Sequence, residues 1–215
     1  MTTTGAGRGA RTDRRATVVL VVIALAAWIA ILVGFDGDGA GMVGFVAAWT
    51  VMMVAMMLPS EMPLILLYRR GATRRATAAL ASGYVAVWAT VGIAAWALDA
   101  AAMNIPVAAV LLAAGIYQLT PIKHACLRRC RTPADFLVEH WRANAFVLGA
   151  DHGRYCLGCC WALMAVLVVA GMMGIIWVMA IAAIVALEKL SSRGAGFARL
   201  TGFVLIALAI IEALA

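Results

Sequence analysis

Long, nearly uninterrupted apolar runs constrain this chain more than any other feature. Six runs are long enough to cross a bilayer as helices, since a span needs about 17 residues or more; they are residues 17–33, 40–67, 76–98, 106–122, 158–187 and 197–214. Apolar residues make up 66% of the chain and charged residues 13%, against about 45–50% and 25% in a soluble domain. The sequence excludes an ordinary soluble protein and predicts an all-α, polytopic membrane helix bundle in one domain, residues 1–215.

The basic residues are grouped in alternate loops. Fourteen of the 17 lie in three clusters: Arg8, Arg11, Arg14 and Arg15; Arg69, Arg70, Arg74 and Arg75; and Lys123, Arg128, Arg129, Arg131, Arg142 and Arg154. Cationic loops of bacterial inner membrane proteins stay in the cytoplasm. The pattern predicts both termini in the cytoplasm, a basic tail over 1–16, and the loops with Asp36, Asp38, Asp99 and Asn104 outside. It also argues against nucleic-acid binding, which needs the charge gathered on one face.

Two parts of this topology have alternatives. Six spans place Lys189, Arg193 and Arg199 outside, against the charge rule, so the fifth run could instead be a re-entrant pair broken near Gly171 and Gly174. A continuous helix is preferred because it satisfies its own backbone hydrogen bonds. The first run could be a signal peptide cleaved after residues 24–26, but its apolar stretch continues to Val33, which favours an uncleaved helix. Residues 132–150 are too polar to span and suit the membrane interface.

All five cysteines lie within 35 residues: Cys126, Cys130, Cys156, Cys159 and Cys160. Two histidines, His124 and His152, accompany them in a predicted cytoplasmic loop over 123–157. Cytoplasmic thiols are kept reduced, so such a cluster indicates metal binding or catalysis rather than structural disulfides. The second group is expected at a helix N-terminus, where the helix dipole stabilises thiolate. The alternative is that these cysteines have only a packing role, as small apolar side chains.

A methionine-rich stretch is the second signal. At 100° per residue, Met52, Met53, Met56 and Met57 share one face of the second helix, followed by Pro59, Glu61 and Pro63. On a continuous fifth helix Cys156, Cys160 and Met164 also share a face. Methionine often only fills space, whereas a carboxylate near membrane depth is a functional candidate by default. Antiparallel packing of the two helices would bring both sulfur faces together.

Three motifs carry a family resemblance. They are Met52-Met53-x-Ala55-Met56-Met57-x-Pro59; Tyr117-x3-Pro121-x-Lys123-x2-Cys126-Leu127-x2-Cys130-Arg131; and His152-Gly153-x-Tyr155-Cys156-x-Gly158-Cys159-Cys160-Trp161, followed by Glu188-Lys189. Over residues 45–190 the chain resembles an uncharacterised bacterial family of predicted metal-binding integral membrane proteins. The resemblance implies a bound metal, without implying transport or catalysis.

These features favour a membrane protein that handles a soft ion, copper(I) before zinc, because thiolates and thioethers together select Cu(I). The predicted ligands are the five cysteines, His124 or His152, and Met52, Met53, Met56, Met57 and Met164, with Glu61 as an auxiliary group. The ion would be transported, delivered or sensed, with a metallochaperone or client metalloprotein as partner besides the lipid bilayer. One alternative is a thiol oxidoreductase that uses Cys156 and Cys159. Another is a structural zinc site on a membrane scaffold. No nucleotide-binding motif suggests a pump, and catalysis is left open.

Overall fold

The computed structural model describes residues 4–35, 41–102, 105–140, 144–169 and 174–214, and within them the regular structure is entirely helical. The helices are α1 (Thr4–Leu32), α2 (Gly41–Gly71), α3 (Arg74–Ala102), α4 (Val107–Leu119), α5 (Pro121–Arg131), α6 (Pro133–His140), α7 (Ala145–Val169), α8 (Ile175–Leu190) and α9 (Gly194–Leu214). The predicted all-α class is confirmed. The predicted outer-loop residues Asp36, Asp38 and Asn104 lie outside the described residues.

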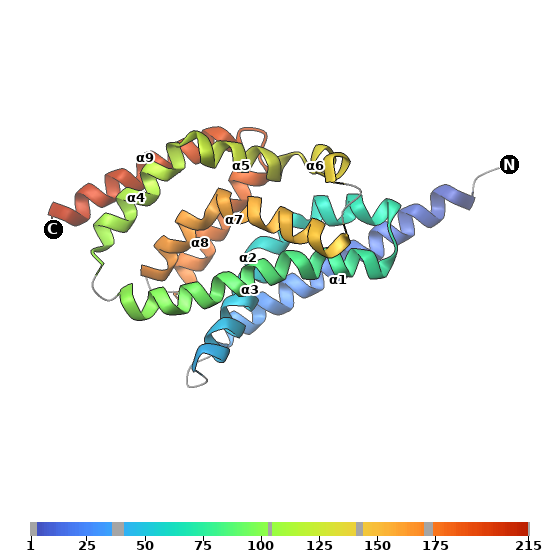
Figure 1. Ribbon diagram of the computed structural model, residues 1–215, viewed down its shortest axis with the longest axis horizontal. Helices are drawn as coiled ribbons and strands as arrows, with labels where there is room; N and C mark the ends of the chain where they lie inside the picture. The colour runs from blue at the N-terminus through green and yellow to red at the C-terminus, as the bar shows by residue number, and fades with distance from the viewer. Residues whose placement is uncertain (1–3, 36–40, 103–104, 141–143, 170–173, 215) are drawn as a thin grey trace.

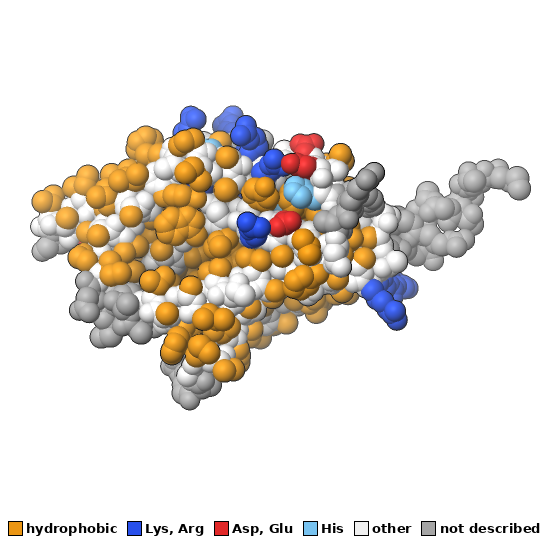
Figure 2. Space-filling view, viewed as in Figure 1, with side chains coloured by type: hydrophobic (Ala, Val, Ile, Leu, Met, Phe, Trp, Pro, Cys, Tyr) orange, Lys and Arg blue, Asp and Glu red, His pale blue; other side chains and the backbone are white. Residues whose placement is uncertain are grey.

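Five of these helices, α1, α2, α3, α7 and α9, are long and apolar enough to cross a membrane. The pair α4 and α5, bent by 65° between them, could form a sixth span. Apolar side chains take up much of the face shown in Figure 2, and on α1 Val22 and Ile29 are more than half exposed. An apolar exterior of this extent is typical of a protein surrounded by lipid.

The helices pack closely where glycine removes a side chain. A Cβ at Gly149 of α7 would collide with the carbonyl oxygen of Leu80 of α3, and one at Gly83 of α3 with the carbonyl of Phe146. The α4–α9 contact is similar, because a Cβ at Gly115 would lie 2.8 Å from the carbonyl oxygen of Gly202. Small residues of this kind let membrane helices approach each other, and α3 and α7 run side by side in Figure 1.

The predicted single helix over 158–187 is wrong. The structure has two helices there, α7 and α8, and the predicted break residue Gly174 is the N-cap of α8 with extended backbone; Gly171 lies outside the described residues. Lys189, near the end of α8, lies 2.9 Å from Cys156 of α7, so α8 runs back towards the cysteines. This return removes the conflict with the charge rule, because Lys189 and Arg193 now share an end of the bundle with the basic loops.

The return of α8 also changes the expected position of the C-terminus. Helix α9 begins beside Glu188, and its Ile211 lines the same cavity as Val107 at the start of α4. The start of α1 and the end of α9 therefore lie at opposite ends of the bundle (Figure 1). This differs from the expectation of two termini on one side, because the sequence interpretation counted α7 and α8 as one crossing.

Helix α7 begins earlier than the sequence suggests. Residues 132–150 were expected at the interface, but only α6 and the first turns of α7 occupy the described part of that stretch. Asn144 caps α7, its side-chain oxygen accepting from the Phe146 N–H at 2.9 Å. Cys156 is thus three turns inside the helix rather than at its N-terminus, and the helix dipole does not act on it.

Candidate functional site: a buried sulfur cluster

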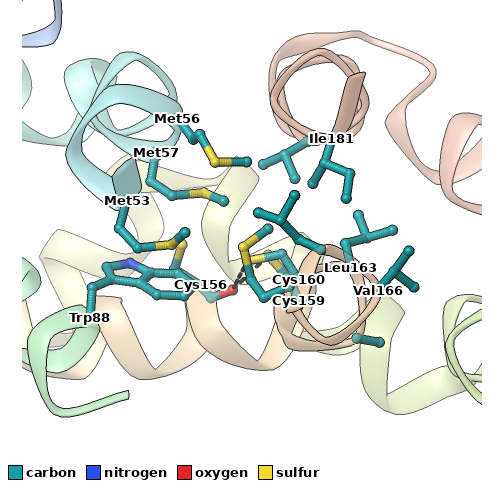
Figure 3. Close-up of a cluster of buried hydrophobic side chains, with 14 of the residues drawn as sticks. Met53, Met56, Met57, Trp88, Cys156, Cys159, Cys160, Leu163, Val166 and Ile181 are labelled. Carbon is teal, nitrogen blue, oxygen red and sulfur yellow. Dashed lines mark hydrogen bonds between the residues drawn. The ribbon is translucent and has the colours of Figure 1, made fainter. Parts of the chain in front are cut away.

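Thioethers of α2 and thiols of α7 are buried in the same part of the interior. Met52, Met53, Met56 and Met57 are each at most 4% exposed, so the predicted methionine face is turned away from lipid. They belong to one apolar cluster with Cys156, Cys159, Cys160 and Met164. Figure 3 shows Met53, Met56 and Met57 reaching from α2 towards the cysteines of α7. We call Met53, Met56, Met57, Cys156, Cys159 and Cys160 the sulfur cluster.

The cysteines differ in how far they are buried. Those of α7 are at most 1% exposed, whereas Cys126 and Cys130 of α5 are partly exposed. Cys130 joins the two groups, since its Sγ lies 3.8 Å from the Sγ of Cys159. Cys126 instead packs against Gly158, where a Cβ would come within 2.7 Å of its sulfur. Sulfur is therefore present from the edge of the bundle to its interior.

A network of polar groups surrounds the Cys156 sulfur. The Lys189 Nζ donates to it at 2.9 Å, and the Tyr84 hydroxyl lies 3.0 Å away. The same ammonium donates to Ser60 Oγ at 3.2 Å and to Glu61 Oε1 at 3.3 Å. The other oxygen of Glu61 is 2.9 Å from His152 Nε2. Groups from α2, α3, α7 and α8 thus converge on one thiol.

A second buried network fixes α5 against α7 and α8. Lys123 donates to Glu188 Oε2 at 2.6 Å and also to the carbonyl oxygen of Cys159. Gln118 donates to the other carboxylate oxygen of Glu188 at 2.8 Å. At the surface, Arg129 donates to Glu139 of α6, and this hydrogen bond lowers the pKa of the Glu139 carboxyl. The helix that carries Cys130 is thereby held beside the sulfur cluster.

The buried charges are balanced in pairs. Glu61 is paired with Lys189 and Glu188 with Lys123, and the side chains of all four are at most 2% exposed. Unpaired charges at such depth are very costly, so pairing is a condition for burying them. An ammonium group beside Cys156 stabilises negative charge on its sulfur. Lys189 therefore performs the role that the sequence interpretation assigned to a helix dipole.

The predicted ligands do not all converge on one point. Within the described residues, no three histidine, cysteine or carboxylate side chains are grouped so that they could hold a metal ion. His152 uses its Nε2 on Glu61, and its buried Nδ1 has no hydrogen-bond partner among the residues that the structure describes. His124 lies on α5, where its buried Nε2 likewise has no partner in the described part of the chain. The fold instead brings together the sulfur cluster, which contains three thioethers and three thiols.

Several residues of the site were not given a role from the sequence, although three of them, Lys123, Glu188 and Lys189, stand in the motifs of the family resemblance. They are Tyr84, Lys123, Glu188, Lys189, Ser60 and Gln118. One signal was available: Glu188 and Lys189 end a long apolar run, and the six-span topology left Lys189 on the wrong side. A lysine that the six-span model places on the outer side, against the positive-inside rule, is better explained as a buried residue paired with an acidic partner. Tyr84 and Gln118 gave no such signal, because their partners lie about 70 residues away in the sequence.

Comparison with known families identifies the chain. Residues 46–212 match the model of a family described as "PpoB2: Copper chaperone". The chain belongs to this copper chaperone family. No curated protein and no solved structure matches the chain.

Membership of the copper chaperone family gives the sulfur cluster a chemical context. Every residue of the cluster and of both polar networks lies within the matched range, whereas α1 lies before it. A copper-related function agrees with the expected preference for copper and with the mixture of thiols and thioethers, which suits a soft ion. Zinc, the second metal considered, gains no support from the family or from the donors, since thioethers are not zinc ligands.

Proposed function

We propose that this protein is a membrane-embedded chaperone that holds Cu(I) in the sulfur cluster and passes it to a client metalloprotein. The observation that carries the proposal is that the α2 thioethers and the α7 thiols belong to one buried cluster, in which Met53, Met56 and Met57 point towards the cysteines (Figure 3). Thiolate and thioether together prefer Cu(I) to zinc or to hard cations. Copper is the cargo here, and the residues of the chain bind it, shield it from water and release it.

The gradient of exposure supports a direction for loading. Cys130 is partly exposed and contacts Cys159, which is buried beside Cys156 and Cys160. A donor metallochaperone would present copper at α5, and the ion would move inward by exchange between neighbouring sulfurs. The thioethers of α2 would then take part in its coordination. Cys126, His124, Met52 and Met164 border this path and are auxiliary ligands in the proposal.

The charge distribution supports an orientation in the bacterial cytoplasmic membrane. Cationic residues of α5 and of the α8–α9 connection lie at the same end as the cysteines, including Arg128, Arg131 and Arg193. By the positive-inside rule this end faces the cytoplasm. The start of α1 shares that end, because Leu20 packs with Leu64 and Tyr68 near the end of α2. The C-terminal end of α9 then faces the opposite side.

Copper binding by purified protein in detergent tests the proposal. The reduced wild type should compete with a chromophoric Cu(I) chelator for one equivalent of metal or more. Replacing Cys156, Cys159 and Cys160 with serine should abolish this binding, since an alcohol is not a soft ligand. A wild type that takes up no Cu(I), or a triple serine variant that binds as the wild type does, would refute it.

A methionine variant separates sulfur chemistry from packing. Methionine to leucine nearly conserves volume and usually costs less than about 1.5 kcal/mol. Replacement of Met53, Met56 and Met57 with leucine should leave a folded protein that holds copper more weakly. The matched control replaces Met42 and Met179, which are 43% and 57% exposed on α2 and α8, and should bind as the wild type. Equal affinity of both variants would assign the buried methionines to packing alone.

A further inference from the structure

We propose that Cys130 and Cys159 are a site of reversible oxidative modification, a disulfide whose formation prevents copper loading. This inference rests on the proposed function, because the same two sulfurs lie on the suggested loading path. The two residues belong to different helices, α5 and α7, and their sulfur atoms lie 3.8 Å apart. Both are free thiols in the structure.

The separation of the two sulfurs is that of atoms in van der Waals contact. A disulfide requires an S–S distance of about 2.05 Å, so the two sulfurs must approach each other by about 1.75 Å from their separation of 3.8 Å. Because Lys123 holds α5 on Glu188 of α8, the approach must come mainly from rotation of the two cysteine side chains.

The other cysteines are less well placed to pair with Cys130. Cys156 also neighbours Cys130, but its sulfur accepts from Lys189 and contacts Tyr84. The Cys159 and Cys160 thiols both donate to the carbonyl oxygen of Cys156, at 3.1 and 2.9 Å, and Cys159 also has its sulfur 3.8 Å from that of Cys130. Cys126 faces Gly158 rather than another thiol. Cys130 is therefore the thiol that combines partial exposure to a small oxidant with a cysteine neighbour on another helix.

Thiol–disulfide exchange with a low-molecular-weight disulfide such as oxidised glutathione supplies the chemistry. The Cys130 thiol loses a proton, and its thiolate attacks one sulfur of the oxidant, giving a mixed disulfide and one glutathione thiolate. The Cys159 thiolate, formed by loss of its proton, then attacks the Cys130 sulfur and releases the second glutathione thiolate. The two departing thiolates take up the two protons, so two protein thiols are oxidised while one glutathione disulfide is reduced to two thiols.

The disulfide would affect copper in two ways. It removes two soft donors from the loading path, since a cystine sulfur is a far weaker ligand than a thiolate. It also ties α5 covalently to α7, which closes the partly exposed side of the sulfur cluster. Oxidation and copper loading are then mutually exclusive, and a reducing thiol restores the loading-competent protein.

The test uses full-length protein in detergent, incubated with oxidised glutathione and mapped by mass spectrometry of non-reduced peptides. We expect a Cys130–Cys159 cross-link in the wild type and in the Cys126→Ser control, but none in Cys130→Ser. The oxidised wild type should bind Cu(I) at least about tenfold more weakly, given that even indirect damage to a metal site costs this much. A reducing phosphine, removed before the assay, should restore binding.

Two results would overturn the inference: a dominant cross-link between other cysteines, or oxidised protein that carries the Cys130–Cys159 bond and still binds copper with unchanged affinity. Failure of the proposed function gives a different result, because the fully reduced wild type would then bind no copper whether or not the cross-link forms.

Discussion

At the scale of single residues, two lysines determine how charge is accommodated inside the bundle. Lys123 is 0% exposed and pairs with Glu188 across 65 residues of sequence. Removing one partner of such a pair leaves an uncompensated buried charge, which typically costs about 3–5 kcal/mol. Removing both charges eliminates that cost, so the two substitutions should not be additive.

We therefore expect Lys123→Met and Glu188→Gln each to lower the free energy of unfolding by about 3–5 kcal/mol, and the double variant to lose clearly less than their sum. Chemical unfolding in detergent micelles, arranged as a double-mutant cycle, measures the coupling. Additive losses would mean that the ion pair contributes nothing beyond the separate contacts of its members.

The sequence predicted the sulfur residues but not their polar partners. Cys156, Met53 and Met57 were identifiable because thiols and thioethers have a recognisable chemistry and helical periodicity places them on one face. Glu61 was identifiable because carboxylates are rare at membrane depth. Lys189 and Tyr84 were not assigned a role, because both act through a contact with Cys156 on another helix. A local sequence pattern cannot predict such a contact.

At the scale of helices, glycine contacts determine how closely α3 and α7 approach. Gly149 of α7 faces the carbonyl oxygen of Leu80, so a methyl group at this position forces the helices apart. Gly196 of α9 is a matched control, because a Cβ there would meet no heavy atom within 4 Å. Alanine at an open helical position should instead stabilise by up to about 1 kcal/mol through helix propensity.

We expect Gly149→Ala to lower the melting temperature and also to weaken Cu(I) binding, since α7 carries three cysteines and its displacement moves them away from α2. Gly196→Ala should leave binding unchanged and melting equal or slightly higher. Thermal unfolding in detergent, with a parallel chelator competition, measures both quantities. Normal stability of Gly149→Ala would show that the helix pair tolerates the extra methyl group.

The helix boundaries show where sequence patterns are insufficient. Residues 158–187 are apolar throughout, and hydropathy cannot distinguish one long helix from α7 followed by the returning α8. The first turns of α7 contain Asp151 and His152, which suggested a loop; His152 is nevertheless buried because Glu61 pairs with it. Contacts with other helices make the polar first turns of α7 helical and divide the apolar stretch 158–187 into two helices. The local sequence pattern predicts neither effect.

At the scale of the whole molecule, the direction of α9 makes a prediction about topology. If the cysteine end faces the cytoplasm, a reporter after Arg131 should be cytoplasmic and one after Asp38 external, as the charge pattern also requires. The structure adds that a reporter after the end of α9 should be external, because this end lies opposite the start of α1 (Figure 1). Reporter fusions active only on one side of the membrane provide the measurement. A cytoplasmic C-terminus would contradict the orientation drawn from α8 and α9.

The central claim is that copper is bound by sulfur from both α2 and α7. X-ray absorption at the copper edge of Cu(I)-loaded protein tests it most directly, because it reports the type and number of atoms around the metal. The account predicts a cuprous ion whose neighbours are mainly sulfur, and fewer sulfurs when Met53, Met56 and Met57 are replaced with leucine. A shell of nitrogen or oxygen neighbours in place of sulfur, beyond one nitrogen from the auxiliary His124, or an unchanged number of sulfurs in the leucine variant, would contradict it.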